Sequence, residues 1–440
     1  MKSRRVHFVS LGCPKNLVDS EVMLGMLVSE GFALTGDPRL AEIIIVNTCA
    51  FIEDAKKEAI DVILSMAQHK REGDAEMLVV AGCLPQRYER EMEGLFPEVD
   101  LFVGAGEFPK IVEFIRDAGE GGRVRVGRPE YLYDHRSPRQ QATPAHTTYI
   151  KIAEGCFHPC SFCIIPKLRG RFRSRDPESI VAEARGMLGR GVRELGLIAQ
   201  DSTAYGRGRE FDLPGLVERI AGLPGEKWIR IMYAYPHGFP MRLIDVMKEH
   251  REVCRYLDVP IQHISERVLG SMRRRGGAAE IRGLMDALRS ELPDIALRTS
   301  LIVGYPGENQ AEFAELYDFV RDSRFEHLGV FTFSPEEGTA AAKLEDRVPP
   351  EVAVERRDRI MELQQGIARE KNASLVGRRL KVLVDGPSEQ SEHLIAARHE
   401  GQAPDIDGVV YINEGNPKVG EFTRVEITDS HVYDLVGRVV

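Results

Sequence analysis

Three cysteines stand close together near the middle of the chain, at the spacing C-x-x-x-C-x-x-C. They are Cys156, Cys160 and Cys163. Thiolates are the usual ligands of iron–sulfur clusters, and a closed 4Fe–4S cubane takes four of them. Three protein thiolates would leave one iron open to a small molecule. Two other interpretations remain at this point, a Cys₃His zinc site that includes His158 and three unrelated buried cysteines.

A second set of three cysteines, Cys13, Cys49 and Cys83, is spread over the first part of the chain. Each follows an apolar run, and helical patterns separate the runs. The runs cover residues 6–11, 43–46, 77–81 and 101–103. Buried strands that alternate with helices favour a doubly wound parallel sheet. Because parallel strands end at one edge, the three thiols are predicted to meet there as a metal or cluster site; accidental burial is the alternative.

The elements after residue 146 predict two further folds. Six apolar runs alternate with helical patterns and indicate a partial (βα)₆ barrel, which places chemistry at the carboxyl ends of its strands. These runs cover residues 148–153, 195–199, 229–233, 257–261, 296–303 and 328–333. Five short runs within residues 375–440 predict a small β-barrel of OB-like size. Residues 117–146, rich in glycine and proline, are predicted to link domains.

Composition and charge narrow the class of protein. The 440 residues are 43% hydrophobic and 29% charged, without an apolar run of membrane-spanning length or a signal-peptide pattern, which favours a cytoplasmic globular protein. The formal net charge of −9 divides into −5 over residues 1–140, zero over 141–374 and −4 over 375–440. No part has the basic excess typical of nucleic-acid binders. We therefore expect a protein partner rather than RNA at the acidic C-terminal barrel.

The two cysteine sets, in this order, resemble the radical S-adenosylmethionine (SAM) methylthiotransferase family. The resemblance implies a methylthiotransferase N-terminal domain (1–116), a linker (117–146), a radical SAM domain (147–372) and a TRAM domain (375–440). It also implies two 4Fe–4S clusters. Cys13, Cys49 and Cys83 would hold an auxiliary cluster as metal ligands, and Cys156, Cys160 and Cys163 would be the catalytic ligands of the cluster that binds SAM.

One motif is specific to a branch of that family. The stretch Ser10-Leu-Gly-Cys-Pro-Lys-Asn-Leu-Val-Asp-Ser-Glu21 resembles the RimO branch, as does Gln402-Ala-Pro-Asp-Ile-Asp-Gly408. RimO enzymes modify an aspartate of ribosomal protein S-12, whereas the tRNA-modifying MiaB branch usually has Gln-Met-Asn in place of Pro14-Lys15-Asn16. The resemblance thus implies methylthiolation of an aspartate β-carbon in S-12. The alternatives are a tRNA adenosine as substrate and a zinc-stabilised binding module without catalysis.

The resemblance also implies cofactors and partners. SAM would serve as methyl donor and as radical source, and an electron donor such as a flavodoxin or ferredoxin would supply electrons. The implied partner is S-12, either free or in the small ribosomal subunit. A tRNA is a less favoured partner, and no membrane is expected as a partner. The expected SAM-binding residues are Phe162, Gln200, Asp201, Gln262, Ser300, Gly304 and Phe331.

The sequence after the cysteine loop carries alternating charge. Arginines at every second position from Arg169 to Arg175 predict an extended segment with one basic face. That face could meet the carboxylate of SAM or of the substrate, or it could be a solvated edge strand. Cys254, the seventh cysteine, is expected to be structural.

Overall fold

A computed structural model describes residues 3–118 and 122–440. The chain forms two compact units, which we describe separately. The first contains residues Met1–Ala142, Ala153–Arg175 and Glu336–Thr339, and the second contains Thr143–Ile152, Asp176–Pro335 and Ala340–Val440. Among the described residues, no helix has the length and apolar character needed to cross a membrane.

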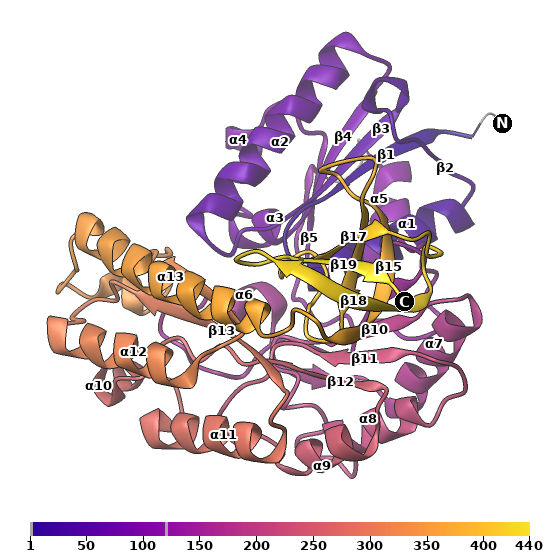
Figure 1. Ribbon diagram of the computed structural model, residues 1–440. Coiled ribbons are helices and arrows are strands. Elements are labelled where there is room, and N and C mark those ends of the chain that lie inside the picture. The colour runs from indigo at the N-terminus through magenta and orange to yellow at the C-terminus, as the bar shows by residue number, and fades with distance from the viewer. Residues whose placement is uncertain (1–2, 119–121) are drawn as a thin grey trace. The chain divides into compact units, whose positions relative to one another are not determined.

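The first unit is built on a parallel sheet with the strand order β2-β1-β3-β4-β5-β6. The strands are β1 (Arg5–Ser10), β2 (Ala33–Leu34), β3 (Ile43–Thr48), β4 (Met77–Gly82), β5 (Leu101–Gly104) and β6 (Val124–Arg125). Every residue of β3 and β4 is buried, as expected where helices cover both faces of a parallel sheet. Helices α1 (Pro14–Ser29) and α5 (Ile111–Arg116) lie on one side and α2 (Glu53–Glu72) on the other (Figure 1).

The predicted parallel sheet is confirmed, with differences at its margins. Strands β2 and β6 add one short strand at each edge, and β6 lies inside the predicted linker 117–146, of which residues 119–121 are outside the described residues. The helical pattern after β4 is two short helices, α3 (Cys83–Arg87) and α4 (Met92–Leu95). Tyr88 to Glu91 interrupt the helical hydrogen bonding between them.

The cysteine loop belongs to the first unit. Strand β8 (Ala153–Glu154) pairs with β9 (Arg173–Ser174), and helix α6 (Ile165–Arg169) lies between them in the sequence. Two side chains of this segment, Ile164 and Leu168, are buried in the same apolar cluster as Cys83 and Leu84. Apolar contact thus anchors the segment to the core of the first unit.

The second unit contains the predicted six-stranded parallel sheet, in the order β14-β13-β12-β11-β10-β7. Its strands are β7 (Thr147–Lys151), β10 (Glu194–Ile198), β11 (Trp228–Ile231), β12 (Val253–Asp258), β13 (Ala296–Val303) and β14 (His327–Thr332). The strand predicted at 257–261 was misplaced, because β12 covers Val253–Asp258 and includes Cys254.

Helices cover the outside of this sheet (Figure 1). They are α7 (Pro177–Gly189), α8 (Leu213–Ala221), α9 (Arg242–Glu249), α10 (Glu266–Ser271), α11 (Gly277–Glu291), α12 (Gln310–Ser323) and α13 (Pro350–Ala373). A strand followed by a helix, repeated in this way, is the pattern that the alternating apolar runs predicted.

The C-terminal residues form the predicted five-stranded β-barrel, which is closed in the order β15-β16-β17-β19-β18. The strands are β15 (Arg379–Pro387), β16 (Ile395–His399), β17 (Val410–Glu414), β18 (Phe422–Ser430) and β19 (Leu435–Val439). The barrel has its own apolar core, which includes Val382, Val410 and Ile427. Closure of the barrel leaves no strand edge unpaired.

Buried ion pairs join this barrel to the six-stranded sheet. Arg398 of β16 pairs with Glu194 at 2.7 Å and with Asp385 at 2.8 Å, and Glu194 also pairs with Arg230 at 2.8 Å. Trp228 packs against Phe422 with ring centroids 4.8 Å apart. The barrel therefore packs on residues from the amino ends of the strands, away from the carboxyl ends where barrel enzymes place their chemistry.

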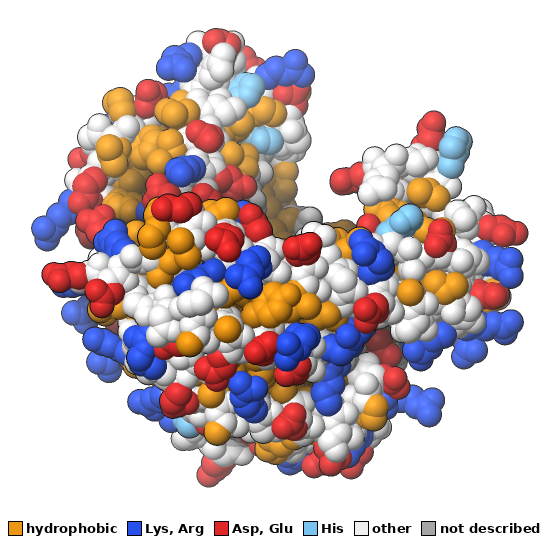
Figure 2. Space-filling view, turned by 60° about the vertical axis from the view of Figure 1, so that its left-hand side comes forward, with side chains coloured by type: hydrophobic (Ala, Val, Ile, Leu, Met, Phe, Trp, Pro, Cys, Tyr) orange, Lys and Arg blue, Asp and Glu red, His pale blue; other side chains and the backbone are white. Residues whose placement is uncertain are grey.

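The net charge of the barrel differs from the balance of its exposed charges. Six acidic side chains of residues 375–440 are exposed, namely Glu389, Glu392, Asp405, Glu414, Glu421 and Asp429. Six basic side chains are exposed as well, namely Arg378, Arg379, Lys381, Lys418, Arg424 and Arg438. The excess acids, among them Asp385 and Asp407, are partly buried. Charges of both signs are likewise mixed on the face of the molecule in Figure 2. The two signs thus balance among the fully exposed side chains, the partly buried acids account for the negative net charge, and the acidic docking surface stays a prediction.

Candidate functional site

The structure brings three cysteines to the carboxyl edge of the first sheet. Cys13 immediately precedes α1, Cys49 follows β3, and Cys83 begins α3 directly after β4. Burial is the main cause of the raised pKa of Cys49, and the neighbouring thiols of Cys83 and Cys13 raise it further. The parallel topology thus gathers side chains that are up to 70 positions apart in the sequence.

Two glycines allow the backbones of these loops to approach each other. Gly12 has φ +89°, and a Cβ at this position would lie 2.6 Å from Cβ and 3.1 Å from Sγ of Cys49. Gly82 has φ +96°, and a Cβ there would lie 2.3 Å from Oδ1 of Asn47. Glycine is the residue that accepts both the left-handed backbone and the close contact. The geometry of the thiol site therefore depends on both glycines.

The three thiols differ in their readiness to ionise. Burial raises the pKa of Cys49 to about 12, with further increases from Cys83 and Cys13. Burial also raises the pKa of Cys83, which Arg169 partly opposes. Burial opposes ionisation of Cys13 too, but Lys15, Arg169 and two backbone N–H groups outweigh it and lower the pKa of that thiol. Ligation requires thiolates, so binding of a cluster must release protons from this site.

Arg169 is a buried basic group beside this site. The guanidinium group is buried, and its Nη1 donates to Asp19 Oδ2, while Nη2 donates to Asn16 Oδ1 at 3.0 Å. Glu154 Oε2 lies 3.7 Å from Nη1. The predicted extended basic stretch from Arg169 to Arg175 is therefore only partly present. Arg169 ends a helix, Arg171 is exposed, and Arg175 is buried with its guanidinium 4.1 Å from the ring centroid of Tyr133.

The second set of cysteines lies in the loop between β8 and α6. Cys156, Cys160 and Cys163 are each half-buried. The N–H of Cys156 donates to Gly170 O at 3.1 Å, and the N–H of Cys163 donates to Cys160 O at 3.1 Å, which curls the loop back on itself. Phe157 packs on His158, with ring centroids 4.3 Å apart, and edge-on against Phe172. Aromatic contacts and backbone hydrogen bonds thus hold the loop that carries the three thiols.

The chemistry of both donor sets fits iron–sulfur clusters. Each set offers three thiols, and thiolates are the ligands that such clusters prefer. In the described part of the chain, no three histidine, cysteine or acidic side chains are grouped as ligands of one metal ion. A cubane distributes its thiolates over different irons, so its ligands need not crowd around a single ion.

The predicted SAM-binding residues divide between the two units. Phe162 is half-buried in the cysteine loop. Gln200 and Asp201 follow β10, and Gly304 follows β13; Ser300 lies in β13 and Phe331 in β14. All of these last five belong to the second unit, as does Gln262.

Several of these residues have local contacts. Gln262 has φ +73° and its N–H donates to Ser300 O at 2.9 Å, so a strained residue stands next to β13. Oδ1 of Asp201 accepts hydrogen bonds from Thr203 Oγ1 at 2.6 Å and from the N–H of Ala204 at 3.2 Å. A Cβ at Gly304 would lie 2.4 Å from that of Ala353 in α13. Asp201 and Gly304 therefore have structural roles apart from any cofactor.

The histidines and Cys254 are held by protein contacts. Burial lowers the pKa of His263 to about 4, and its Nδ1 accepts the N–H of Ser265 at 2.9 Å. His237 is exposed and pairs with Glu280 at 2.7 Å. Cys254 is fully buried in β12, and burial raises the pKa of its thiol to about 12.

The sequence did not reveal one ionic contact near the thiols. Glu336 is buried and accepts a hydrogen bond from Arg87 Nη1 at 2.8 Å, while Lys56 Nζ lies 3.2 Å away. The same Arg87 Nη1 donates to the carbonyl of Ala50, the residue after Cys49, at 2.8 Å. Arg87 is 249 positions from Glu336 in the sequence, and no local pattern links them.

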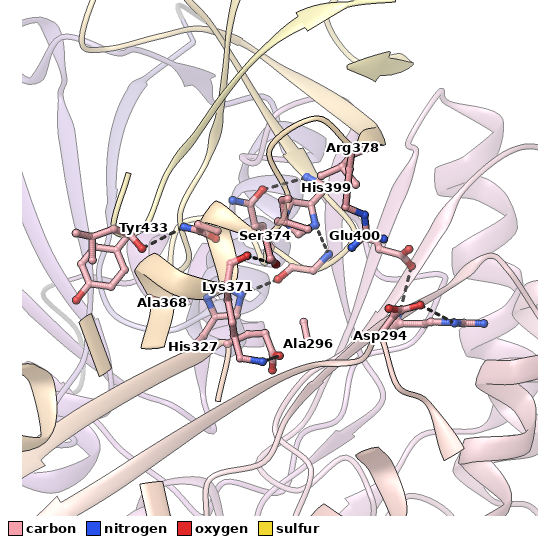
Figure 3. A pocket seen from close by; sticks show the side chains of 18 of the residues that line it. Asp294, Ala296, His327, Ala368, Lys371, Ser374, Arg378, His399, Glu400 and Tyr433 are labelled. Atoms are coloured by element: carbon pink, nitrogen blue, oxygen red, sulfur yellow. Dashed lines mark hydrogen bonds and ion pairs between the residues drawn. The ribbon is translucent and has the colours of Figure 1, made fainter. Parts of the chain in front are cut away.

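A cavity of about 410 Å³ lies on the barrel side of the second unit (Figure 3). Its walls include Ala296 and His327 at the amino ends of β13 and β14, Lys371 of α13, and Arg378 and His399 from the barrel segment. Lys371 pairs with Glu326, and His327 Nε2 lies 2.7 Å from Gly401 O. Since the predicted SAM residues follow the carboxyl ends of the strands, this cavity is a separate feature.

Models of three known families match successive parts of the chain. The Uncharacterized protein family UPF0004 matches residues 5–104, the Radical SAM superfamily matches residues 150–320, and the TRAM domain matches residues 376–440. The first match covers the sheet with Cys13, Cys49 and Cys83, and the second covers the Cys156–Cys163 loop. The three matches agree with the three folds that the structure contains.

Curated relatives match the chain over its whole length. The ribosomal protein uS12 methylthiotransferase RimO of Geotalea uraniireducens (strain Rf4) is 49% identical over 440 residues, which are 99% of this chain and 98% of that protein. The enzyme of the same name from Geobacter sulfurreducens is 49% identical over 444 residues, with the same coverage. The chain belongs to the RimO family of methylthiotransferases. The RimO resemblance carried by residues 10–21 is thereby confirmed.

Solved structures share the fold at low sequence identity. The radical SAM methyltransferase TsrM from Kitasatospora setae, with tryptophan substrate and a SAM analogue bound, has a TM-score of 0.57 and 16% identity. The match covers 87% of this chain and 78% of that one. The cobalamin-dependent radical SAM enzyme OxsB has a TM-score of 0.50 at 11% identity, covering 82% of this chain and 56% of that one. At these identities the likeness concerns the fold alone.

Proposed function

We propose that this protein methylthiolates ribosomal protein uS12 by radical SAM chemistry, at the β-carbon of an aspartate. One observation carries the proposal. A chain of the RimO family holds two sets of three cysteines within one compact unit. A methylthio group must be built and then attached to a carbon whose C–H bond is not acidic, so acid–base catalysis alone does not serve.

The six cysteines are the residues that would hold the two 4Fe–4S clusters. Cys156, Cys160 and Cys163 would hold the catalytic cluster that binds SAM, and Cys13, Cys49 and Cys83 would hold the auxiliary cluster. When bound, the clusters and SAM supply sulfur, a methyl group and the capacity to abstract a hydrogen atom. The protein's part is to hold these groups by thiolates, to fix the loops that carry them and to exclude water.

We also propose that residues that follow the strands of the second unit contribute contacts to SAM. Gln200, Gln262 and Ser300 are the polar candidates, and Phe331, half exposed, is an aromatic candidate for the adenine. The left-handed backbone of Gln262 supports this assignment, because strained residues cluster at ligand sites. Asp201 and Gly304 contribute through the local contacts described above.

The partners follow from the chemistry. A low-potential electron donor such as a flavodoxin or ferredoxin would reduce the clusters, and a cytoplasmic location fits thiols that must stay reduced. The uS12 protein, free or in the small subunit, is the proposed substrate.

The test compares the two substrate classes directly. Purified enzyme is reconstituted anaerobically and incubated with SAM, a reductant and either uS12, small ribosomal subunits or tRNA. We expect mass spectrometry to find a methylthio group on an aspartate of uS12 and no modified adenosine. Cys13→Ala serves as the control, since it should abolish the product while SAM cleavage continues. Methylthiolated adenosine as the product would move the protein to the tRNA-modifying class.

A further inference from the structure

Arg169 connects the two cysteine sets of the first unit. It is the last residue of α6 and stands six positions after Cys163. Its guanidinium is not on the surface but buried beside the auxiliary thiols, where it bonds to Asp19 and Asn16 of α1. A side chain from the segment that carries one set of ligands thus completes the surroundings of the other set.

The partners of Arg169 are themselves tied to the auxiliary loops. Nδ2 of Asn16 donates to Leu11 O at 2.6 Å, in the loop that leads to Cys13. Nδ2 of Asn47 donates to Asn16 O at 3.0 Å, and Asn47 stands two residues before Cys49. The hydrogen bonds of Arg169 to Asn16 and Asp19 therefore act on the loops that present two of the three thiols.

Arg169 also acts on the thiols electrostatically. Its buried guanidinium is held by Asn16 and Asp19, which stand three and six residues after Cys13. Arginine stays protonated in proteins, so its charge is permanent. A permanent positive charge is the group that a buried cluster of thiolates needs to offset its own negative charge.

We propose that Arg169 is a positioning residue for the auxiliary cluster: it supplies a fixed positive charge and fixes the cysteine loops through Asp19 and Asn16. The inference rests on the proposed function, since it assumes a cluster on Cys13, Cys49 and Cys83. The reduction potential of an iron–sulfur cluster depends on net charge and on hydrogen bonds to its sulfurs. Arg169 therefore sets this potential upward, and the adjacent Asp19 carboxylate limits the increase.

The experiment uses the full-length chain with Cys156, Cys160 and Cys163 replaced by alanine, so that only the auxiliary cluster remains. In this background we compare Arg169→Gln, Arg169→Lys and Asp19→Asn. Arg171→Gln is the matched control, because it removes the same charge from an exposed position two residues away. Each protein is reconstituted with iron and sulfide. Iron content, visible absorption and the reduction potential by anaerobic titration are then measured.

We expect opposite shifts from the two partners. Arg169→Gln should shift the potential to more negative values, Asp19→Asn to more positive values, and Arg169→Lys should stay near the background. Arg171→Gln should change neither potential nor iron content. Damage to the fold alone would not produce shifts of opposite sign, so the signs separate charge from structure.

Two negative results have different meanings. If the background protein binds about four irons but Arg169→Gln and Arg171→Gln have the same potential, the role of Arg169 is refuted and the cluster assignment survives. If the background protein binds no iron, the ligand assignment of Cys13, Cys49 and Cys83 fails, and the inference about Arg169 fails with it.

Discussion

The contact of Gly12 with Cys49 allows a sharp test of the auxiliary site. Replacing Gly12 by alanine places a Cβ 2.6 Å from Cβ and 3.1 Å from Sγ of Cys49, at φ +89°. Gly31 provides a matched control in the same unit, because its φ is +88° and nothing lies within 4 Å of its Cβ position. The two substitutions therefore share the backbone cost and differ in the contact with Cys49.

The magnitudes follow from this comparison. A left-handed backbone costs a non-glycine residue about 1–2 kcal/mol, and both variants bear that cost. Overpacking in a filled site costs about 1–3 kcal/mol more, and only Gly12→Ala bears it. We thus expect Gly12→Ala to lower the free energy of unfolding of the apo protein by about 1–3 kcal/mol more than Gly31→Ala does. The displacement of Cys49 should also disturb the auxiliary cluster.

The assay combines urea unfolding with iron analysis. After anaerobic reconstitution, Gly31→Ala should hold about eight irons per chain, four for each cubane, whereas Gly12→Ala should fall toward about four. Uncoupled cleavage of SAM should persist in Gly12→Ala, because the Cys156–Cys163 loop is not changed. If Gly12→Ala retains the full iron content and is as stable as Gly31→Ala, the close approach of these loops is not needed to build the site.

Two further predictions concern the ligands and the domain interface. Replacing Cys156, Cys160 and Cys163 together by alanine should halve the iron content and abolish SAM cleavage. Replacing Cys13, Cys49 and Cys83 together by alanine should also halve the iron content but leave SAM cleavage intact. Full iron content in either variant would contradict the ligand sets, and Cys254→Ala should change neither the iron content nor SAM cleavage. Arg398→Met removes the partner that Glu194 and Asp385 share, while Glu194 keeps Arg230 and Asp385 keeps His146. It should therefore cost about 1–3 kcal/mol in urea unfolding, against less than about 1 kcal/mol for exposed Arg438→Met. Equal losses in these two variants would show that the buried interface contributes little.

The strand pattern predicted the fold class because apolar runs report burial on both faces. Four of the strands of the first sheet and the alternation of strands and helices in the second unit were recognised from such runs. The fourth strand of the second sheet was misplaced for a local reason. Arg255 interrupts the apolar pattern of β12, so the run at 257–261 is predicted as the strand instead. That run contains Pro260, a residue that central strands exclude, and β12 ends before it at Asp258.

The candidate site was predictable where topology alone decides position. Cys13, Cys49 and Cys83 follow strands, so a parallel sheet brings them together whatever their side chains contact. Which arginines of the stretch 169–175 are buried and which are exposed was not predictable in this way. Arg169 and Arg171 look alike in the sequence, yet Asp19 and Asn16, about 150 positions earlier, bury one and leave the other exposed. The ion pairs of Glu194 and Arg398 are invisible locally for the same reason.

Anchoring of the cysteine loop bears on how two clusters could cooperate. Residues 153–175 belong to the first unit, although the strand that precedes them, β7, belongs to the second. Ile164 and Leu168 pack in the apolar cluster that contains Cys83, and Arg169 bonds to α1. Transfer of a group between two sites requires that their geometry be maintained, because small misplacements lower rates steeply. In this chain the contacts that hold both cysteine sets lie within the first unit.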